Sequence, residues 1–498
     1  MSAKFVPRRV AALLVLGIAA LSPLPVNAGN AGAVPAIGNW LDDPLGVAPA
    51  RLLDDANMTA LDVTSDCLKL GVPHQPVSLI VAVDYSLCRS PEVAGTWAAI
   101  KVQAAALGQA RAAYLPSLSA IVNRQHTRSM YSEPESTSIS VKGISMSAGL
   151  SWRLFDFGAR AATERSASDL LLATMADHDS TLQRILTTTI QTYFDTQTAR
   201  AVWIASTHNM ETAKETLNSA KRREQMGTVA RSDTLQAATA YAKAILEQSR
   251  AQGSFRKNLA TLTFNRGMSS GEPIALADES EYVPAPGALG DSLDRFVGDL
   301  ELWLSTAQHS HPAIKAAQAQ WAAAKAVVRA TRAEGLPTVD LAVNTFKNGF
   351  PGQGLSANAS RVNTVGIAIS FPIFDGFAHS YKIREMQARQ DQKDAALKEV
   401  ARHILTDVVK THADAQSSLG NLSASKQLLD AATEAQLSAT RKYDRGAADI
   451  LEILQTQNAV ADARQERVRC LSEWRSARLR LMTSAGILGL GRLPDELK

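Results

Sequence analysis

Two acidic side chains in matching positions are the residues most suited to chemistry in this chain of 498 residues. Asp233 lies six residues after Gly227, and Glu452 lies six residues after Gly446. As ordinary helix-start residues, they would be favoured by the positive end of the helix dipole. That role is electrostatic and requires no catalysis.

Other groups that could support catalysis or ligand binding are sparse. His309 and His311 flank Ser310, but no carboxylate or cysteine cluster at ligand spacing accompanies them. A helix-start or loop role therefore fits these histidines better. The net charge of +4 gives no case for a nucleic-acid partner. We expect no enzyme activity, no cofactor and no metal site.

The glycine motifs belong to an internal duplication that covers most of the chain. Gly227 and Gly446 are separated by 446 − 227 = 219 residues, and the same offset links Leu154-Phe155-Asp156 to Ile373-Phe374-Asp375. A nearby offset of 337 − 116 = 221 links the Leu-Pro pair at Pro116 to the one at Pro337. The fold must therefore contain two equivalent halves.

The first 28 residues have the pattern of a secretory signal. Lys4, Arg8 and Arg9 precede an apolar run from Val10 to Leu21, which is too short to span ~30 Å of hydrocarbon. No later stretch approaches 18 continuous apolar residues. We therefore expect an exported protein without membrane-spanning helices.

Export bears on the three cysteines, because exported chains meet an oxidising compartment. Cys67 and Cys88 could close a loop of about 20 residues, which would stabilise the fold by ~3 kcal/mol. The alternative is two unpaired thiols in an irregular segment. Cys470 is expected to be a small packed residue on a helix near Trp474.

Each half starts with a helix and continues as a pair of strands. Prolines at the first turn predict helices from Pro91 to about Tyr114 and from Pro312 to about Ala333. Alternating apolar residues predict strands at 144–154 and 365–373, and weaker strands precede them at 117–124 and 338–347. Loops at 129–137 and 348–360 join the strands, so each half contributes one hairpin.

A proline-free helical region follows each hairpin, at 159–264 and at 378–484. The glycine motifs interrupt these regions about two-thirds of the way along. We predict a long helix, a turn and a shorter returning helix in each half. Residues 159–226 as one helix would span roughly 100 Å.

The chain organisation predicted from these patterns has six parts. It comprises a signal peptide (1–28), an irregular leader with one short helix near 50–60 (29–90), a first repeat (91–270), a linker (271–311), a second repeat (312–488) and a tail (489–498).

Four alternating strands point to an α+β membrane protein that must assemble. An open sheet edge in lipid leaves backbone groups without partners, so several chains must pool their strands. Two chains would supply eight strands and three would supply twelve, and the residues alone leave this choice open. The long helices would continue the barrel wall outside the membrane. A soluble coiled-coil scaffold would explain the helices but not the hairpins or the export signal.

The order and spacing of these segments resemble the TolC-type outer-membrane efflux and secretion proteins, over residues 91–490. The resemblance rests on the duplication, on the strand-to-helix segments Leu154–Gly158 and Pro372–Gly376, and on Tyr443-Asp444-Arg445-Gly446 followed by Asp449–Leu454. It implies a homotrimer in the cell outer membrane with a 12-stranded barrel and a periplasmic α-helical barrel. It also implies a periplasmic adaptor (membrane fusion protein) and an inner-membrane ABC transporter or other pump as partners.

Site residues follow from the resemblance position by position. The tips that dock the adaptor match Gly227, Thr228, Val229, Gly446 and Ala447. The acidic position that narrows the entrance is Glu452, so the resemblance implies a ring of three carboxylates that favours cations. The second acidic position of the family prototype is Gln455 here, so a doubled ring is not implied. The latch that closes the entrance matches Asp233 and Tyr443, whereas its arginine position is Ala448.

The segment Leu87-Cys88-Arg89-Ser90-Pro91, together with the cysteine pair, resembles the CyaE-type branch of the family. That branch exports large toxins in type I secretion. The resemblance thus implies export of a protein across the whole envelope. Multidrug efflux by a three-part pump is the alternative.

Overall fold

The computed structural model describes residues 44–45, 47, 76–131, 137–265, 275–277, 298–348, 360–445 and 447–487. The chain divides into two units, residues 1–46 and 47–498, and all of the described helices and strands belong to the second. The predicted signal peptide, the helix near 50–60, Cys67, Gly446 and the C-terminal tail lie outside the described residues.

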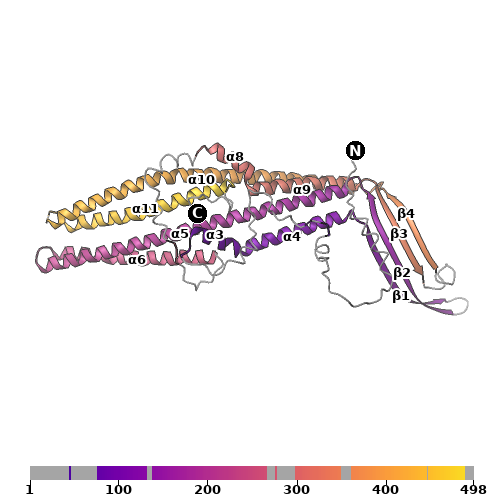
Figure 1. Cartoon of the computed structure of the whole chain (residues 1–498), viewed down its shortest axis with the longest axis horizontal. Helices are drawn as coiled ribbons and strands as arrows, with labels where there is room; N and C mark the ends of the chain where they lie inside the picture. The colour runs from indigo at the N-terminus through magenta and orange to yellow at the C-terminus, as the bar shows by residue number, and fades with distance from the viewer. Residues whose placement is uncertain are drawn as a thin grey trace, which may run out of the picture. The chain divides into compact units, whose positions relative to one another are not determined.

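The described chain is mostly helical with one small sheet, and its two halves repeat the same order of elements (Figure 1). The first half contains α4 (Pro91–Ala112), β1 (Ser117–Tyr131), β2 (Thr137–Phe155), α5 (Ala159–Gln225) and α6 (Arg231–Asn265). The second half contains α9 (Pro312–Glu334), β3 (Thr338–Asn348), β4 (Ser360–Ser370), α10 (Ala378–Asp444) and α11 (Ile450–Ser484). Both α5 and α10 have 67 residues, and both α6 and α11 have 35. The duplication in the sequence is thus a duplication of helix lengths.

Two helices lie in the segments predicted as an irregular leader and a linker. Helix α3 (Leu79–Cys88) lies in the predicted leader, and α8 (Leu300–Ser310) lies in the predicted linker. The prediction of irregular structure was wrong at α3. The ten residues of this helix are almost all apolar and show no helical period. Ser78 caps the helix, and the side chains of Leu79, Val83 and Leu87 are buried in one cluster with Tyr193 of α5. Packing on α5 therefore stabilises a helix that the pattern alone does not indicate.

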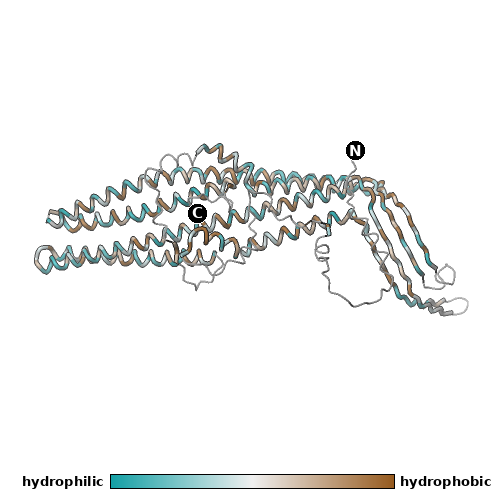
Figure 2. The backbone as a smooth tube through the Cα atoms, viewed as in Figure 1, coloured by the Kyte–Doolittle hydropathy of each residue, from teal (hydrophilic) through white to brown (hydrophobic). Residues whose placement is uncertain are grey.

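The strands form one antiparallel sheet in the order β1-β2-β3-β4. Strands β1 and β2 run past the predicted limits, to Tyr131 and from Thr137. One row across the sheet pairs Leu118, Leu150, Val343 and Val365. The next row pairs Ser119, Gly149, Asn344 and Thr364, whose side chains point to the other face. One face of the sheet is therefore apolar and the other small and polar. Hydrophobic and hydrophilic residues both occur along the strands in Figure 2.

No element among the described residues covers the apolar face. Leu118 is 77% exposed, and Val365 and Ile369 are each 73% exposed. On the polar face, Arg153 Nε lies 2.9 Å from Asp340 Oδ1 and joins β2 to β3. Within the described residues β1 pairs only with β2, and β4 only with β3. The sheet thus has two open edges and one bare apolar face.

The strand-to-helix turns hold each hairpin on its long helix. In the first half, Asp156 accepts hydrogen bonds from the Gly158 amide (3.2 Å), the Arg160 amide (3.0 Å) and Arg160 Nε (2.8 Å). In the second half, Asp375 accepts a hydrogen bond from the His379 amide (2.7 Å). Asp156 and Asp375 therefore each accept an amide from the first turn of the helix that follows them.

Helix α5 packs against α3, α4, α6, α9 and α11, while α10 packs against α8, α9 and α11. The buried side chains form several small clusters along these contacts rather than one thick core. The sheet lies at one end of these helices, and the α5–α6 and α10–α11 turns lie at the other (Figure 1).

Among the described residues, no helix combines the length and the apolar character needed to cross a lipid bilayer.

Candidate functional site at the helix turns

The α5–α6 turn, here the first tip (residues 221–233), reverses the chain through a glycine. Gly227 has φ +69°, its amide donates to the Glu224 carbonyl (2.9 Å), and the Thr228 amide donates to the Arg223 carbonyl (2.9 Å). This pair of bonds is a Schellman motif, which needs a left-handed residue at the glycine position. A Cβ at Gly227 would meet no atom within 4 Å, so backbone conformation alone selects glycine here.

The α10–α11 turn, here the second tip (residues 440–452), repeats one of these two hydrogen bonds. The Ala447 amide donates to the Lys442 carbonyl (2.9 Å), which is the bond that Thr228 makes in the first tip. Asp449 then caps α11, because its side chain accepts the Ile450 amide at 2.6 Å. The predicted docking residues Gly227, Thr228, Val229 and Ala447 thus lie on two equivalent turns, and Gly446 lies outside the described residues.

Glu452 lies in the first turn of α11 and makes an ion pair across its tip. Lys442 Nζ, in the last turn of α10, lies 3.2 Å from Glu452 Oε1. The two side chains are 55% and 42% exposed, so solvent weakens the pair. Each charge also lies at the helix end that its sign favours.

Asp233 lies in the equivalent first turn of α6, but its surroundings differ. Its Oδ1 accepts a hydrogen bond from Ser232 Oγ at 3.1 Å. Among the described residues no ion pair reaches Asp233, and no hydrogen bond joins it to Tyr443. The latch role of Asp233 and Tyr443 stays a prediction.

Tyr443 instead contacts an arginine of the other repeat. The Arg223 guanidinium carbon lies 4.2 Å from the centre of the Tyr443 ring, and Arg223 Nη1 donates to the Tyr443 carbonyl oxygen at 3.4 Å. The ring is buried, and it packs with Ile450, Ile453 and Leu454 of α11. This contact joins the first tip to the second.

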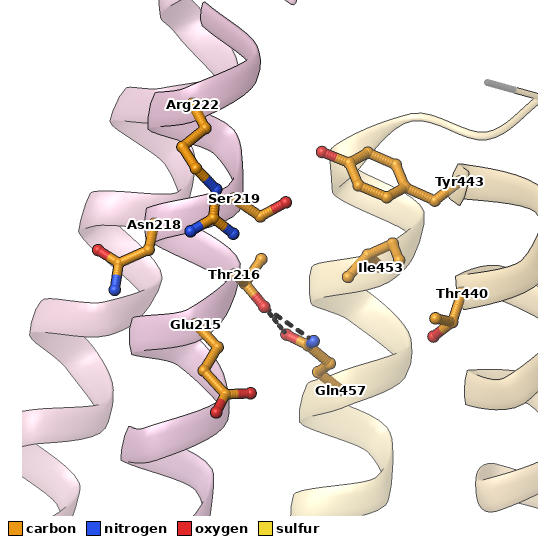
Figure 3. Close-up of a pocket in the computed structure, with 9 residues that line it drawn as sticks. All are labelled: Glu215, Thr216, Asn218, Ser219, Arg222, Thr440, Tyr443, Ile453 and Gln457. Atoms are coloured by element: carbon orange, nitrogen blue, oxygen red, sulfur yellow. Dashed lines mark hydrogen bonds between the residues drawn. The ribbon is translucent and has the colours of Figure 1, made fainter. Parts of the chain in front are cut away.

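A groove of about 400 Å³ lies between the two helical hairpins beside these tips (Figure 3). Gln457 Nε2 of α11 donates to Thr216 Oγ1 of α5 at 3.0 Å, which bridges the groove. Most of the other lining side chains are polar: Glu215, Asn218, Ser219, Arg222 and Thr440, together with Tyr443 and Ile453.

Sequence reasoning missed Arg223 and Lys442, which carry the principal contacts of the two tips. The signal was present, because the duplication offset that links the glycines also links these residues (442 − 223 = 219). Basic side chains in the last turn of a helix are common, however, and their partners lie on other helices.

The remaining candidates are placed away from the tips. Cys88 ends α3 and is disulfide-bonded, and Cys470 is free and buried. Because Cys67 lies outside the described residues, its pairing with Cys88 stays a prediction.

His311 caps α9 through its Nδ1, and burial lowers its pKa to about 4 despite the opposing charge of Asp407. The helix-start role expected for His311 is thus confirmed.

No group of three or more His, Cys, Asp or Glu side chains that could hold a metal ion occurs in the part of the chain that the structure describes.

Known proteins are similar to this chain in sequence and in fold. The family model described as "Outer membrane efflux protein" matches residues 82–267 and 303–487. Protein CyaE of Bordetella pertussis is 33% identical over 423 residues, which is 84% of this chain and 86% of CyaE. The pyoverdine export outer membrane protein OpmQ of Pseudomonas aeruginosa is 25% identical over 92% of each chain. The crystal structure of CusC, 18% identical, superposes with a TM-score of 0.71 over 83% of this chain and 92% of CusC.

Proposed function

The chain belongs to the outer membrane efflux protein family, and on this basis we propose that it is the outer-membrane channel of a type I secretion system. In this role it exports a protein, such as a toxin, directly across the envelope. The family consists of transport channels rather than enzymes. The TolC-type resemblance, its CyaE-type branch and the outer-membrane location with periplasmic helices, all predicted from the sequence, are confirmed.

The observation that carries the secretion proposal is the 33% identity to CyaE across 84% of the chain. The aligned region covers both repeats rather than one motif, so the similarity extends over the whole proposed channel.

The sheet supports a homotrimer. Strand β1 of one chain would pair with β4 of the next, so that three four-stranded sheets close into a 12-stranded barrel and no edge remains open. The apolar row from Leu118 to Val365 would then face lipid, and the Arg153–Asp340 ion pair would face the lumen. The strands have 11 to 19 residues, so each reaches or exceeds the ~9–11 that a tilted strand needs to cross a bilayer.

The helices of three chains would form the periplasmic barrel, with the six tips at its entrance. Glu452, Asp233 and Tyr443 would line or close that entrance. The turns at Gly227, Thr228, Val229, Gly446 and Ala447 would dock a periplasmic adaptor, which connects the channel to an inner-membrane ABC transporter or another pump.

A second candidate is the outer-membrane component of a tripartite multidrug efflux pump. It is favoured by OpmQ, a pyoverdine export protein that matches 92% of this chain. A strain that lacks this chain separates the two functions. Type I secretion predicts that a protein disappears from the culture medium while the accumulation of small dyes stays unchanged, and that the restored gene reverses the loss. Unchanged secreted proteins with raised dye accumulation would support efflux and contradict secretion.

A further inference from the structure

The two tips carry the same charges at equivalent positions. The duplication offset of 219 relates Arg223 to Lys442 and Asp233 to Glu452. The last turn of each long helix has two basic residues, Arg222 and Arg223 in the first tip and Arg441 and Lys442 in the second. The first turn of each returning helix has one acidic residue. If the tips were used alike, each would hold one internal ion pair.

Among the described residues, only the second tip forms this internal ion pair. Lys442 Nζ lies 3.2 Å from Glu452 Oε1, so the glutamate charge is neutralised within its own tip. The side chains are partly exposed, which keeps them in contact with water.

In the first tip the equivalent arginine points elsewhere. Arg223 lies over the Tyr443 ring at 4.2 Å and donates to the Tyr443 carbonyl oxygen, and both contacts belong to the second tip. Asp233 keeps a hydrogen bond from Ser232 and meets no cationic side chain in the described part of the chain. One acidic position is thus compensated and its equivalent is not.

We infer that Asp233, rather than Glu452, is the carboxylate that sets the charge preference of the channel entrance, and that Lys442 acts as a selectivity-determining residue by cancelling Glu452. This inference rests on the proposed channel function. In a trimer it predicts three uncompensated Asp233 carboxylates and three neutral Lys442–Glu452 pairs around the entrance.

The test is the cation-to-anion permeability ratio of the full-length protein in planar bilayers, measured from reversal potentials in a KCl gradient. Lys442→Met should raise the ratio about threefold, the size expected for three screened unit charges within one Debye length (~8 Å at physiological salt) of the ion path. Asp233→Asn should lower it by a similar factor. The double variant Lys442→Met/Glu452→Gln should return to the native ratio, because it removes a neutral pair.

Lys426→Met is the matched control, since Lys426 is an exposed lysine of the same helix far from the tip. It should leave the ratio unchanged. An unchanged ratio in both Lys442→Met and Asp233→Asn would overturn the inference while leaving the channel in place. A native trimer that forms no pores in the bilayer would instead contradict the channel function itself, and the inference with it.

Discussion

Arg223 of the first repeat lies over the ring of Tyr443 of the second repeat, 4.2 Å from its centre, at the end of the helices remote from the sheet. The two long hairpins are covalently separate at this end, so contacts of this kind hold their tips together. A cation–π contact at a partly exposed site is worth about 0.5–2 kcal/mol. Arg223 and Tyr443 are therefore one pair that holds the two tips together.

Replacing Arg223 by methionine should loosen the second tip. Without the guanidinium, the Tyr443 ring loses its cover and its carbonyl loses a donor, so amide hydrogen exchange across residues 440–450 should speed up by about 2- to 30-fold. Arg231→Met is the control, because Arg231 is an exposed arginine of the same turn region. Equal exchange in the native protein and in Arg223→Met would show that the contact does not hold the tips.

Two glycine-to-alanine changes should have opposite effects on stability. Gly227 has φ +69°, so alanine there should cost about 1–2 kcal/mol through backbone strain alone. Gly253 lies inside α6 with nothing within 4 Å of a Cβ, so alanine there should stabilise by about 0.5–1 kcal/mol. Thermal denaturation of the detergent-extracted protein checks both. A fall in the melting temperature for both variants would mean that α6 is packed more tightly than the structure shows.

The stability of the helical part should depend on pH through Asp179 of α5. Burial raises the pKa of this carboxyl to about 6, and the nearby Lys315 of α9 opposes the rise. Below pH ~3 the carboxyl is protonated in both states and has no effect on stability, and near pH 4 only the unfolded chain is partly ionised. As the pH rises towards 6 the unfolded chain ionises first, so the folded state loses stability, and the full loss is present above pH 6.

Asp179→Asn should therefore stabilise the protein by about 1–3 kcal/mol at pH 7 and have little effect at pH 4. Denaturant unfolding at the two pH values measures this difference. Asp391→Asn, an exposed change on α10, should have an effect within about 0.5 kcal/mol at both. A stabilisation of equal size at pH 4 and pH 7 would exclude the ionisation of Asp179 as its cause.

Disulfide cross-linking should trap the proposed contact between chains at the sheet edges. One cysteine replaces Val122 in β1, and a second cysteine is placed in turn at each position from Arg361 to Ile369 in β4. Successive side chains of a strand point to opposite faces, so at most every second β4 position should give covalently linked chains. Cysteines at Leu150 and Val343, which face each other within one chain, are the control and should link without joining chains. Links within a single chain for the β1–β4 pairs would mean that the sheet closes on itself.

The sequence predicted the elements that repeat and missed those that depend on contacts between helices. Apolar alternation from Ile144 to Leu154 is a local signal, and so is the glycine at 227, because pleating and a left-handed turn are decided by neighbouring residues. Helix α3 escaped prediction because its stability comes from packing against Tyr193, more than 100 residues away. Lys442 and Arg223 carry the same charge at equivalent positions, and only three-dimensional structure separates the ion pair of one from the ring contact of the other.

The central claim is that three copies of this chain form one outer-membrane channel. Native mass spectrometry of the protein extracted from outer membranes in detergent counts the chains directly. We predict a complex of three mature chains, each lighter than the 53.2 kDa of the full sequence because the signal peptide has been removed. A complex of one or two chains would contradict the claim.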